Sequence, residues 1–127
     1  MRLIDRITRA GLRLGLGRRS TALIETIGRK SGQPRVTPVT NGLDGDVFWI
    51  VTEHGHKANY VRNIEAHPQV RVNAGRGWRK GTARIVEEDP EKRLAQIVAL
   101  NPRAKANAQI VRRTGTQNLV IRIDLAK

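Results

Sequence analysis

The sequence predicts an α+β fold in which a small antiparallel β-barrel carries flanking helices. Short runs rich in β-branched and aromatic residues recur along the chain, and clusters of Gly, Asn, Asp and Pro separate them. Segments with helical spacing are short and stand between these runs. With 127 residues, of which 39% are hydrophobic, we expect one barrel domain over residues 20–127, preceded by a separate segment, residues 1–19.

The N-terminal segment predicts a basic amphipathic helix over residues 1–17. A helix of this kind can lie on an anionic membrane surface, and the alternative is a helix docked on the domain with its cations in water. The same charges interrupt the apolar core that a signal peptide needs, so we expect a cytoplasmic protein, with peripheral attachment to the inner face of the membrane as an option. The basic face of this helix is a stripe of four arginines at helical spacing: Arg2, Arg6, Arg9 and Arg13.

Three strands are expected in the first half of the chain. Thr21–Ile27 and Arg35–Thr40 flank a turn over Gly28–Pro34. A second turn, Asn41–Asp46, leads into the apolar run Val47–Thr52, which predicts a central, buried strand. Because short turns join these strands, we expect an antiparallel meander.

The second half adds three more strands with helices between them, giving six strands and three or four helices in all. Asp89 and Pro90 mark a helix start, because Asp caps a helix and Pro fits its first turn. The expected elements are a helix over Asn59–Ala66, strands over Gln69–Asn73 and Trp78–Val86, a helix from Asp89 to about Leu100, a weakly helical stretch over 103–113, and a strand over Gln117–Leu125.

The charge and the cysteine content restrict the partners. A formal net charge of +13 attracts polyanions such as nucleic acid, an anionic membrane or a highly charged small molecule. The absence of cysteine excludes disulfides, thiol nucleophiles and thiolate metal sites. Nucleic acid is not the expected partner, because stacking needs exposed aromatic residues and two of the four lie in the apolar strand. The four are Phe48, Trp49, Tyr60 and Trp78.

The turn from Gly28 to Arg35 concentrates groups that bind anions. Glycines let backbone amides approach an anion closely. Arg29 and Arg35 can each grip a phosphate or carboxylate through two hydrogen bonds, and Lys30 adds a point charge. The spacing alone fits two interpretations: an anion-binding site, or an exposed hairpin turn with solvated cations.

The loop Thr52–Lys57 follows the buried strand and predicts a polar cover over a pocket. His54 and His56 form a His-x-His pair, but the only nearby third ligands, Glu53 or His67, lack convincing spacing, so no metal site is expected. The chain also has no nucleophile elbow, Walker A loop or Gly-x-Gly-x-x-Gly motif. If the protein is an enzyme, a cofactor therefore carries the chemistry.

One combination of motifs over residues 20–75 resembles the deazaflavin-dependent nitroreductase family, flavin/deazaflavin oxidoreductases with the split β-barrel fold. The motifs are Gly28-Arg29-Lys30-Ser31-Gly32-x-x-Arg35-x-x-Pro38, the apolar strand Phe48–Val51, a Gly-containing loop, and Tyr60-x-x-Asn63-Ile64-x-Ala66-x-Pro68-x-Val70.

The resemblance implies a site for coenzyme F420, with FMN as the alternative cofactor. It implies that reduced F420 passes a hydride to an electron-poor acceptor, namely a quinone, an enone or a nitro compound. The positions that match the family are Arg29, Lys30, Ser31, Gly32 and Arg35 for the phosphate and glutamate tail, Thr37 and Pro38 beside the ring, Thr52, Glu53, His54 and Gly55 along the deazaflavin edge, and Tyr60 and Asn63 near the cofactor.

The chain departs from the family pattern in its last third, where some relatives place tyrosines that line the substrate pocket. No tyrosine follows Tyr60, so the candidate proton donors are His54, His56 and Tyr60, and the alternatives are a proton from solvent or no donor at all. The alternatives are an FMN- or FAD-binding protein of the same fold, a non-catalytic F420 carrier, and a basic module that binds nucleic acid or membrane. The expected assembly is a monomer or a homodimer.

Overall fold

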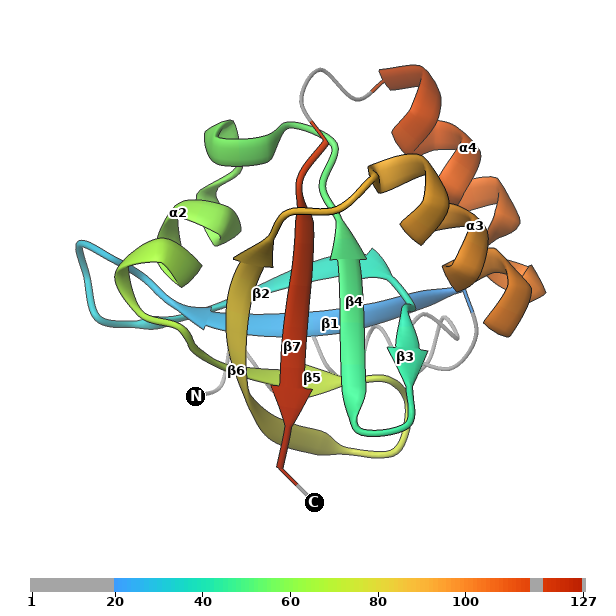
Figure 1. The fold of residues 1–127 in the computed structure, drawn as a ribbon. Coiled ribbons are helices and arrows are strands. Elements are labelled where there is room, and N and C mark those ends of the chain that lie inside the picture. The colour runs from blue at the N-terminus through green and yellow to red at the C-terminus, as the bar shows by residue number, and fades with distance from the viewer. Residues whose placement is uncertain (1–19, 115–117, 127) are drawn as a thin grey trace.

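The computed structural model describes residues 20–114 and 118–126, and these form an antiparallel sheet curled into a half-barrel with flanking helices (Figure 1). This confirms the predicted fold class. The helix expected over residues 1–17, and the boundary at residue 19, lie outside the described residues.

The sheet has the order β2-β1-β5-β6-β7-β4-β3, and every neighbouring pair is antiparallel. Strands β2 and β3 are therefore its two edges. The strands are β1 (Thr21–Ile27), β2 (Pro34–Thr40), β3 (Leu43–Asp44), β4 (Val47–Val51), β5 (Gln69–Asn73), β6 (Trp78–Val86) and β7 (Val120–Leu125).

The expected meander is wrong, because β4 does not pair with β2. After β2 the chain turns at Asn41 and Gly42, where the Trp49 amide donates to the Gly42 carbonyl at 2.9 Å. The predicted turn contains the short strand β3, which raises the strand count of the described residues to seven. Strand β4 then pairs with β7 along its whole length. Strands β2 and β4 are therefore not hydrogen-bonded to each other, and we call the gap between them the seam.

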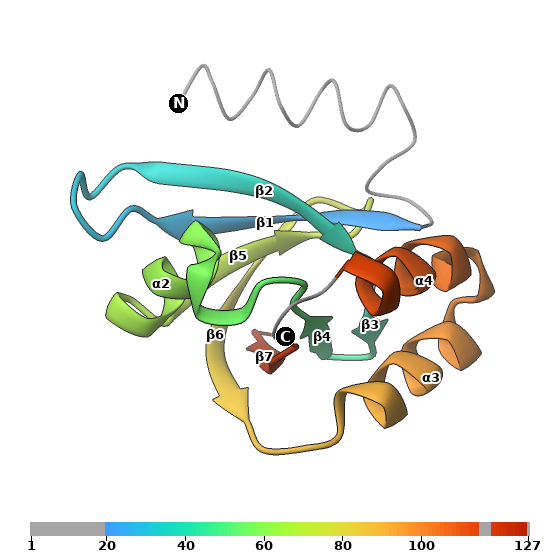
Figure 2. The ribbon, with the colours of Figure 1, turned by 90° about the horizontal axis from the view of Figure 1, so that it is seen from above.

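Both predicted helices with clear start or stop signals are confirmed, as α2 (Asn59–Ala66) and α3 (Pro90–Leu100). The weakly helical stretch is a 3-10 turn, η2 (Pro102–Ala104), followed by α4 (Lys105–Thr114). Helices α3 and α4 lie together on one flank of the sheet and α2 on the other (Figure 2). Among the described residues, no helix is long and apolar enough to cross a membrane.

Strand β4 contributes to two hydrophobic cores, which explains its continuous apolar run. Phe48 and Ile50 point into the barrel, where they pack with Ile121 and Ile123 of β7. Trp49 points the other way, toward α3 and α4. The prediction of a buried central strand is therefore confirmed. The second core contains Trp49, Val51, Leu94, Ile97, Ala104, Ala108, Val111 and Val120.

Candidate functional site

The turn between β1 and β2 is closed by backbone hydrogen bonds. The Gly28 amide donates to the Gln33 carbonyl and the Gly32 amide to the Gly28 carbonyl, both at 2.8 Å. Gly32 has a φ of 70°, a conformation that favours glycine. A Cβ at Gly28 would lie 2.6 Å from the Ser31 hydroxyl. The backbone angle therefore selects glycine at position 32, and a larger residue at position 28 would displace the Ser31 side chain.

The cations of the turn carry unbalanced charge. Within the part of the chain that the structure describes, no carboxylate forms an ion pair with Arg29, Lys30 or Arg35. Arg35 Nη2 donates to the Ser31 hydroxyl at 3.4 Å, and the same hydroxyl accepts from the Gln33 amide at 3.1 Å. Three cations on a closed turn form a cradle suited to an anion.

Helix α2 holds one side of this cradle through Asn63, which is buried. Its Oδ1 accepts hydrogen bonds from the Arg29 amide and from Arg29 Nη1, both at 3.1 Å. Its Nδ2 donates to the buried Thr26 hydroxyl, also at 3.1 Å. The carboxamide is thus used by the protein itself, so Asn63 acts on the cradle by fixing Arg29.

A hollow of about 410 Å³ opens beside the turn. It brings together most of the residues predicted to hold the tail and adds Thr37 from β2 and Tyr60 from α2. Gly32 and Pro38 do not line it. Its lining is Gly28, Arg29, Lys30, Ser31, Arg35, Val36, Thr37, Asn59, Tyr60 and Asn63.

Two smaller hollows continue from the first along β2. One, of about 190 Å³, lies in the seam between β2 and β4 and includes Pro38, Glu53, His54 and Tyr60. The other, of about 210 Å³, reaches α4. Tyr60 lines both the first and the second hollow, and the second and third share Pro38 and Glu53. We call this row of three adjoining hollows, from the cationic turn to α4, the β2 groove.

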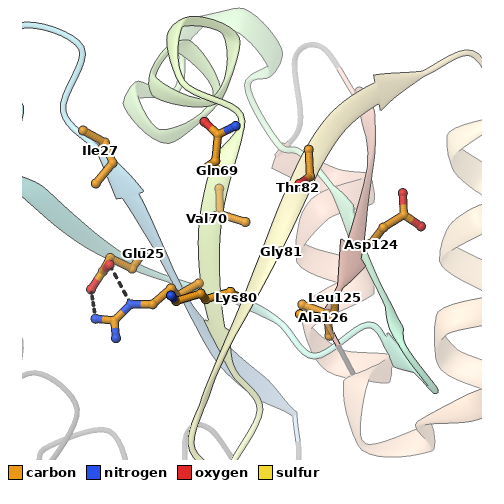
Figure 3. A pocket seen from close by; sticks show the side chains of 11 residues that line it. Glu25, Ile27, Gln69, Val70, Lys80, Gly81, Thr82, Asp124, Leu125 and Ala126 are labelled. Carbon is orange, nitrogen blue, oxygen red and sulfur yellow. Dashed lines mark hydrogen bonds and ion pairs between the residues drawn. The ribbon is translucent and has the colours of Figure 1, made fainter.

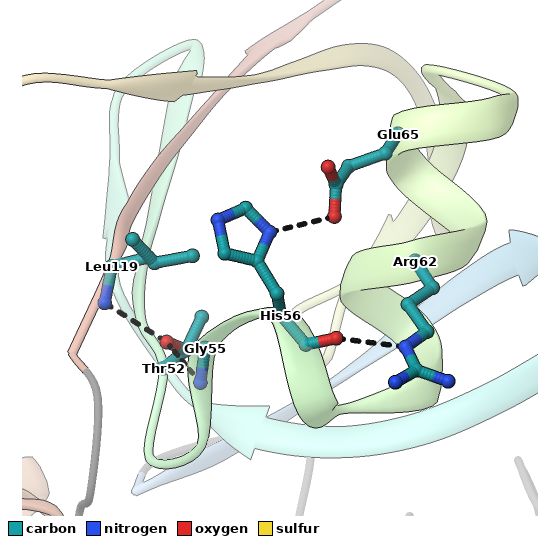
Figure 4. Close-up of polar contacts among 6 residues, drawn as sticks. All are labelled: Thr52, Gly55, His56, Arg62, Glu65 and Leu119. Atoms are coloured by element: carbon teal, nitrogen blue, oxygen red, sulfur yellow. Dashed lines mark hydrogen bonds and ion pairs between the residues drawn. The ribbon is translucent and has the colours of Figure 1, made fainter.

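The loop after β4 places its predicted residues in two different settings. Thr52 is buried, and its hydroxyl oxygen accepts from the amides of Gly55 at 3.1 Å and Leu119 at 2.9 Å (Figure 4). Neither Thr52 nor Gly55 lines the β2 groove. Glu53 and His54 do line it. Thr52 and Gly55 therefore shape the loop, while the two residues between them face the groove.

His56 is directed toward α2. Its Nδ1 lies 2.9 Å from Glu65 Oε1, and its carbonyl accepts from Arg62 Nε at 2.9 Å (Figure 4). It does not line the β2 groove. The two histidines of the His-x-His pair thus point to different surroundings. In the described parts of the chain, no three or more His, Asp or Glu side chains gather as a metal site would need.

Tyr60 separates the cationic hollow from the seam hollow, since it lines both. Burial raises the pKa of its phenol well above the ordinary value, and the nearby charge of Glu53 raises it further. The phenol therefore keeps its proton at neutral pH.

The sequence offered no signal for the α4 side of the groove. Asn107 and Ile110 line the third hollow and Val111 lines the second, because α4 packs beside the end of β2. The sequence predicts α4 only as a weakly helical stretch over residues 103–113. Its position beside β2 depends on the barrel closing through β7, a pairing between segments far apart in the chain.

A larger hollow, about 630 Å³, lies elsewhere in the described part of the chain and crosses β1, β5, β6 and β7 (Figure 3). At one side of it Glu25 accepts two hydrogen bonds from Arg71, at 2.9 and 2.6 Å. Arg71 also lies over the Trp78 ring at 5.1 Å. None of the predicted site residues lines this hollow, so size does not identify the site.

Comparison with solved structures supports the fold. An F420-H2-dependent reductase (FDR-A) has a TM-score of 0.59 at 24% identity and covers 83% of this chain and 94% of that chain. HutZ, the heme storage protein from Vibrio cholerae, has a TM-score of 0.59 at 17% identity, covering 86% and 83%. At such identities the likeness concerns the fold, and it confirms the predicted split β-barrel.

Comparison of sequences shows the family. The F420H(2)-dependent quinone reductase of Mycobacterium tuberculosis (strain ATCC 25618 / H37Rv) is 38% identical over 84 residues, covering 62% of this chain and 56% of that protein. This chain thus spans little more than half the length of the curated relatives it matches. A family model described as F420H(2)-dependent quinone reductase matches residues 4–125, and the chain belongs to that family.

Proposed function

We propose that this protein binds reduced coenzyme F420 in the β2 groove and reduces a quinone there. The observation that carries the proposal is the form of the groove, which begins at unbalanced cations and ends beside Asn107 and Ile110 of α4. The family name supports the cofactor and the acceptor. Enones and nitro compounds remain alternative acceptors.

The cationic end fits the anionic tail of the cofactor. Arg29, Lys30 and Arg35 would bind its phosphate and glutamate carboxylates, since charged hydrogen bonds of this kind are the strong ones. Asn63 already fixes Arg29. Binding therefore requires little reordering of that side chain, which lowers its entropic cost.

The middle of the groove fits a flat ring. Thr37, Pro38 and Tyr60 would border the deazaflavin, with Glu53 and His54 on the loop side. The cofactor, when bound, supplies the hydride. The chain's own residues hold the tail, orient the ring and limit the access of water. The acceptor would enter from the α4 end, past Asn107 and Ile110.

Binding is tested by adding protein to F420 and following fluorescence anisotropy. Lys30→Ala with Arg35→Ala should weaken binding by tenfold or more. A well-formed hydrogen bond to a charged group contributes about 1.5–3 kcal/mol, and partial exposure of these side chains to water reduces that contribution. The control is Lys80→Ala with Lys92→Ala, which removes the same charge from β6 and α3. Equal weakening in both variants would show that only net charge matters, and would overturn the site.

Turnover separates a reductase from an F420 carrier. Oxidation of reduced F420 in the presence of a soluble quinone such as menadione should depend on the protein and be lost in the Lys30→Ala, Arg35→Ala variant. Binding without turnover would favour the carrier. Tighter binding of FMN or of nucleic acid than of F420 would favour those alternatives. Docking of residues 1–17 on anionic vesicles stays a separate prediction from the sequence.

A further inference from the structure

Reduction of a quinone to a neutral hydroquinone needs a proton as well as a hydride. The hydride brings two electrons, and the oxygen that becomes negatively charged must gain a proton. Water or an acidic side chain can provide it, and a positioned side chain accelerates such a step by roughly 10²–10⁴-fold. A side chain that serves as this donor has to line the groove and exchange protons near neutral pH.

Three titratable side chains line the seam hollow among the described residues: Glu53, His54 and Tyr60. Tyr60 is a poor acid here, because burial and the charge of Glu53 raise the pKa of its phenol. Histidine is the side-chain type that gains and loses a proton around neutral pH. Its position on the hollow makes His54 the candidate.

The surroundings of His54 suit a side chain that is protonated repeatedly. Its Nε2 lies 3.9 Å from Glu53 Oε2, so a carboxylate stands beside the imidazole ring. Its side chain is 52% exposed, which allows renewed protonation from water. His56, by contrast, contacts Glu65 on α2. His54 therefore lines the β2 groove, whereas His56 connects its loop to α2.

We propose that His54 is the proton donor to the quinone. As the hydride with its two electrons reaches the quinone, an imidazolium N–H bond of His54 breaks and an O–H bond forms on the quinone oxygen. The products are neutral hydroquinone and neutral imidazole, and the imidazole then takes a proton from water. The cofactor side is oxidised by two electrons and the quinone reduced by two. This inference rests on the proposed function.

Among the described residues, His54 is the one histidine that lines the seam hollow. The uncharged residues of its lining are Pro38, Val39 and Thr40 of β2, Ile50 and Val51 of β4, Ala58 before α2, and Val111 of α4. Glu53 on its own loop and Tyr60 on α2 are the titratable groups that face it. A rate that falls as pH rises past neutrality would therefore report His54.

The test compares His54→Gln with His67→Gln, a matched change at an exposed histidine after α2. Menadione reduction is measured between about pH 5.5 and 8.5, together with F420 affinity. His54→Gln should lose at least about tenfold in kcat at pH 7 and lose the decline of kcat toward high pH, with a much smaller loss of F420 affinity. His67→Gln should keep the wild-type profile.

Three results would overturn the inference. They are an unchanged kcat and pH profile in His54→Gln, loss of the pH-dependent decline in His56→Gln instead, and a loss of F420 affinity in His54→Gln as large as its loss in kcat. Failure of the wild-type protein to bind F420 would overturn the proposed function itself. The binding measurement thus keeps the two failures apart.

Discussion

Asn63 holds Arg29 at two points, through hydrogen bonds of 3.1 Å from its Oδ1 to the Arg29 amide and to Arg29 Nη1. The two residues are 34 positions apart, so helix α2 fixes a turn of the β1–β2 hairpin. A guanidinium held in this way is oriented before any ligand arrives. This contact links the second sequence motif, Tyr60-x-x-Asn63, to the first.

Asn63→Ala removes both of these contacts and the one to Thr26. Unpaired buried polar groups cost about 1–3 kcal/mol, so the free energy of unfolding should fall by that order, and F420 affinity should fall about tenfold. Thr26→Val serves as the control, because it costs stability while leaving the Arg29 contacts in place. Urea unfolding and F420 anisotropy measure the two effects. Wild-type affinity in Asn63→Ala would contradict the positioning role.

Thr52→Val should destabilise the loop after β4. Valine has nearly the same shape as threonine but cannot accept the hydrogen bonds from the Gly55 and Leu119 amides. We expect a loss of about 1–3 kcal/mol in the free energy of unfolding, measured by urea denaturation. Thr52→Ser keeps the hydroxyl and should lose less. A larger loss in the serine variant would mean that packing of the methyl group dominates.

Gly42→Ala should be far more damaging than Gly45→Ala. A Cβ at Gly42 would lie 2.1 Å from the Trp49 carbonyl oxygen, so the backbone of β4 has to move, at a cost of about 3 kcal/mol or more. Gly45 has a φ of 61° but open space around it, and alanine there costs about 1–2 kcal/mol. The comparison is made by thermal unfolding followed by circular dichroism. Similar melting temperatures would rule out the close approach at Gly42.

The stability of the protein should depend on Tyr60 at high pH. Folding raises the pKa of this phenol, so its contribution to stability is complete below about pH 10, the ordinary tyrosine pKa, and is lost as pH rises toward the folded value. Above about pH 10, wild type should therefore lose stability faster than Tyr60→Phe. Tyr60 is the chain's single tyrosine, so phenolate absorbance reports its titration directly. Titration at the ordinary pKa in the folded protein would contradict its burial.

Elements that depend on neighbouring residues were predictable from the sequence. The ranges Gln69–Asn73 and Trp78–Val86 were predicted as strands and Asn59–Ala66 as a helix, and the structure has the same bounds. Alternating side chains, turn residues and caps determine these elements locally. The Gly28–Arg35 turn belongs to the same class, because its glycines and cations are adjacent in the chain, and anion binding by this turn stays a prediction.

Pairings between distant segments were not predictable in this way. Strand β4 pairs with β7, which comes some 70 residues later, and no local pattern distinguishes this from pairing with β2. The α4 side of the groove was missed for the same reason. Which residues of the loop after β4 face the β2 groove could not be predicted either. Hydrogen bonds to other segments turn Thr52 inward and His56 toward α2.

Strand β2 is an edge strand, and two of its seven residues, Pro34 and Pro38, are prolines. Proline has no backbone N–H, so β2 cannot offer a continuous row of donors to a strand of another molecule. Exposed edges otherwise act as templates for aggregation. The open side of the sheet can therefore remain accessible to small molecules without nucleating fibrils. Replacing both prolines by threonine would add two backbone donors to this edge and open it to pairing with a strand of another chain.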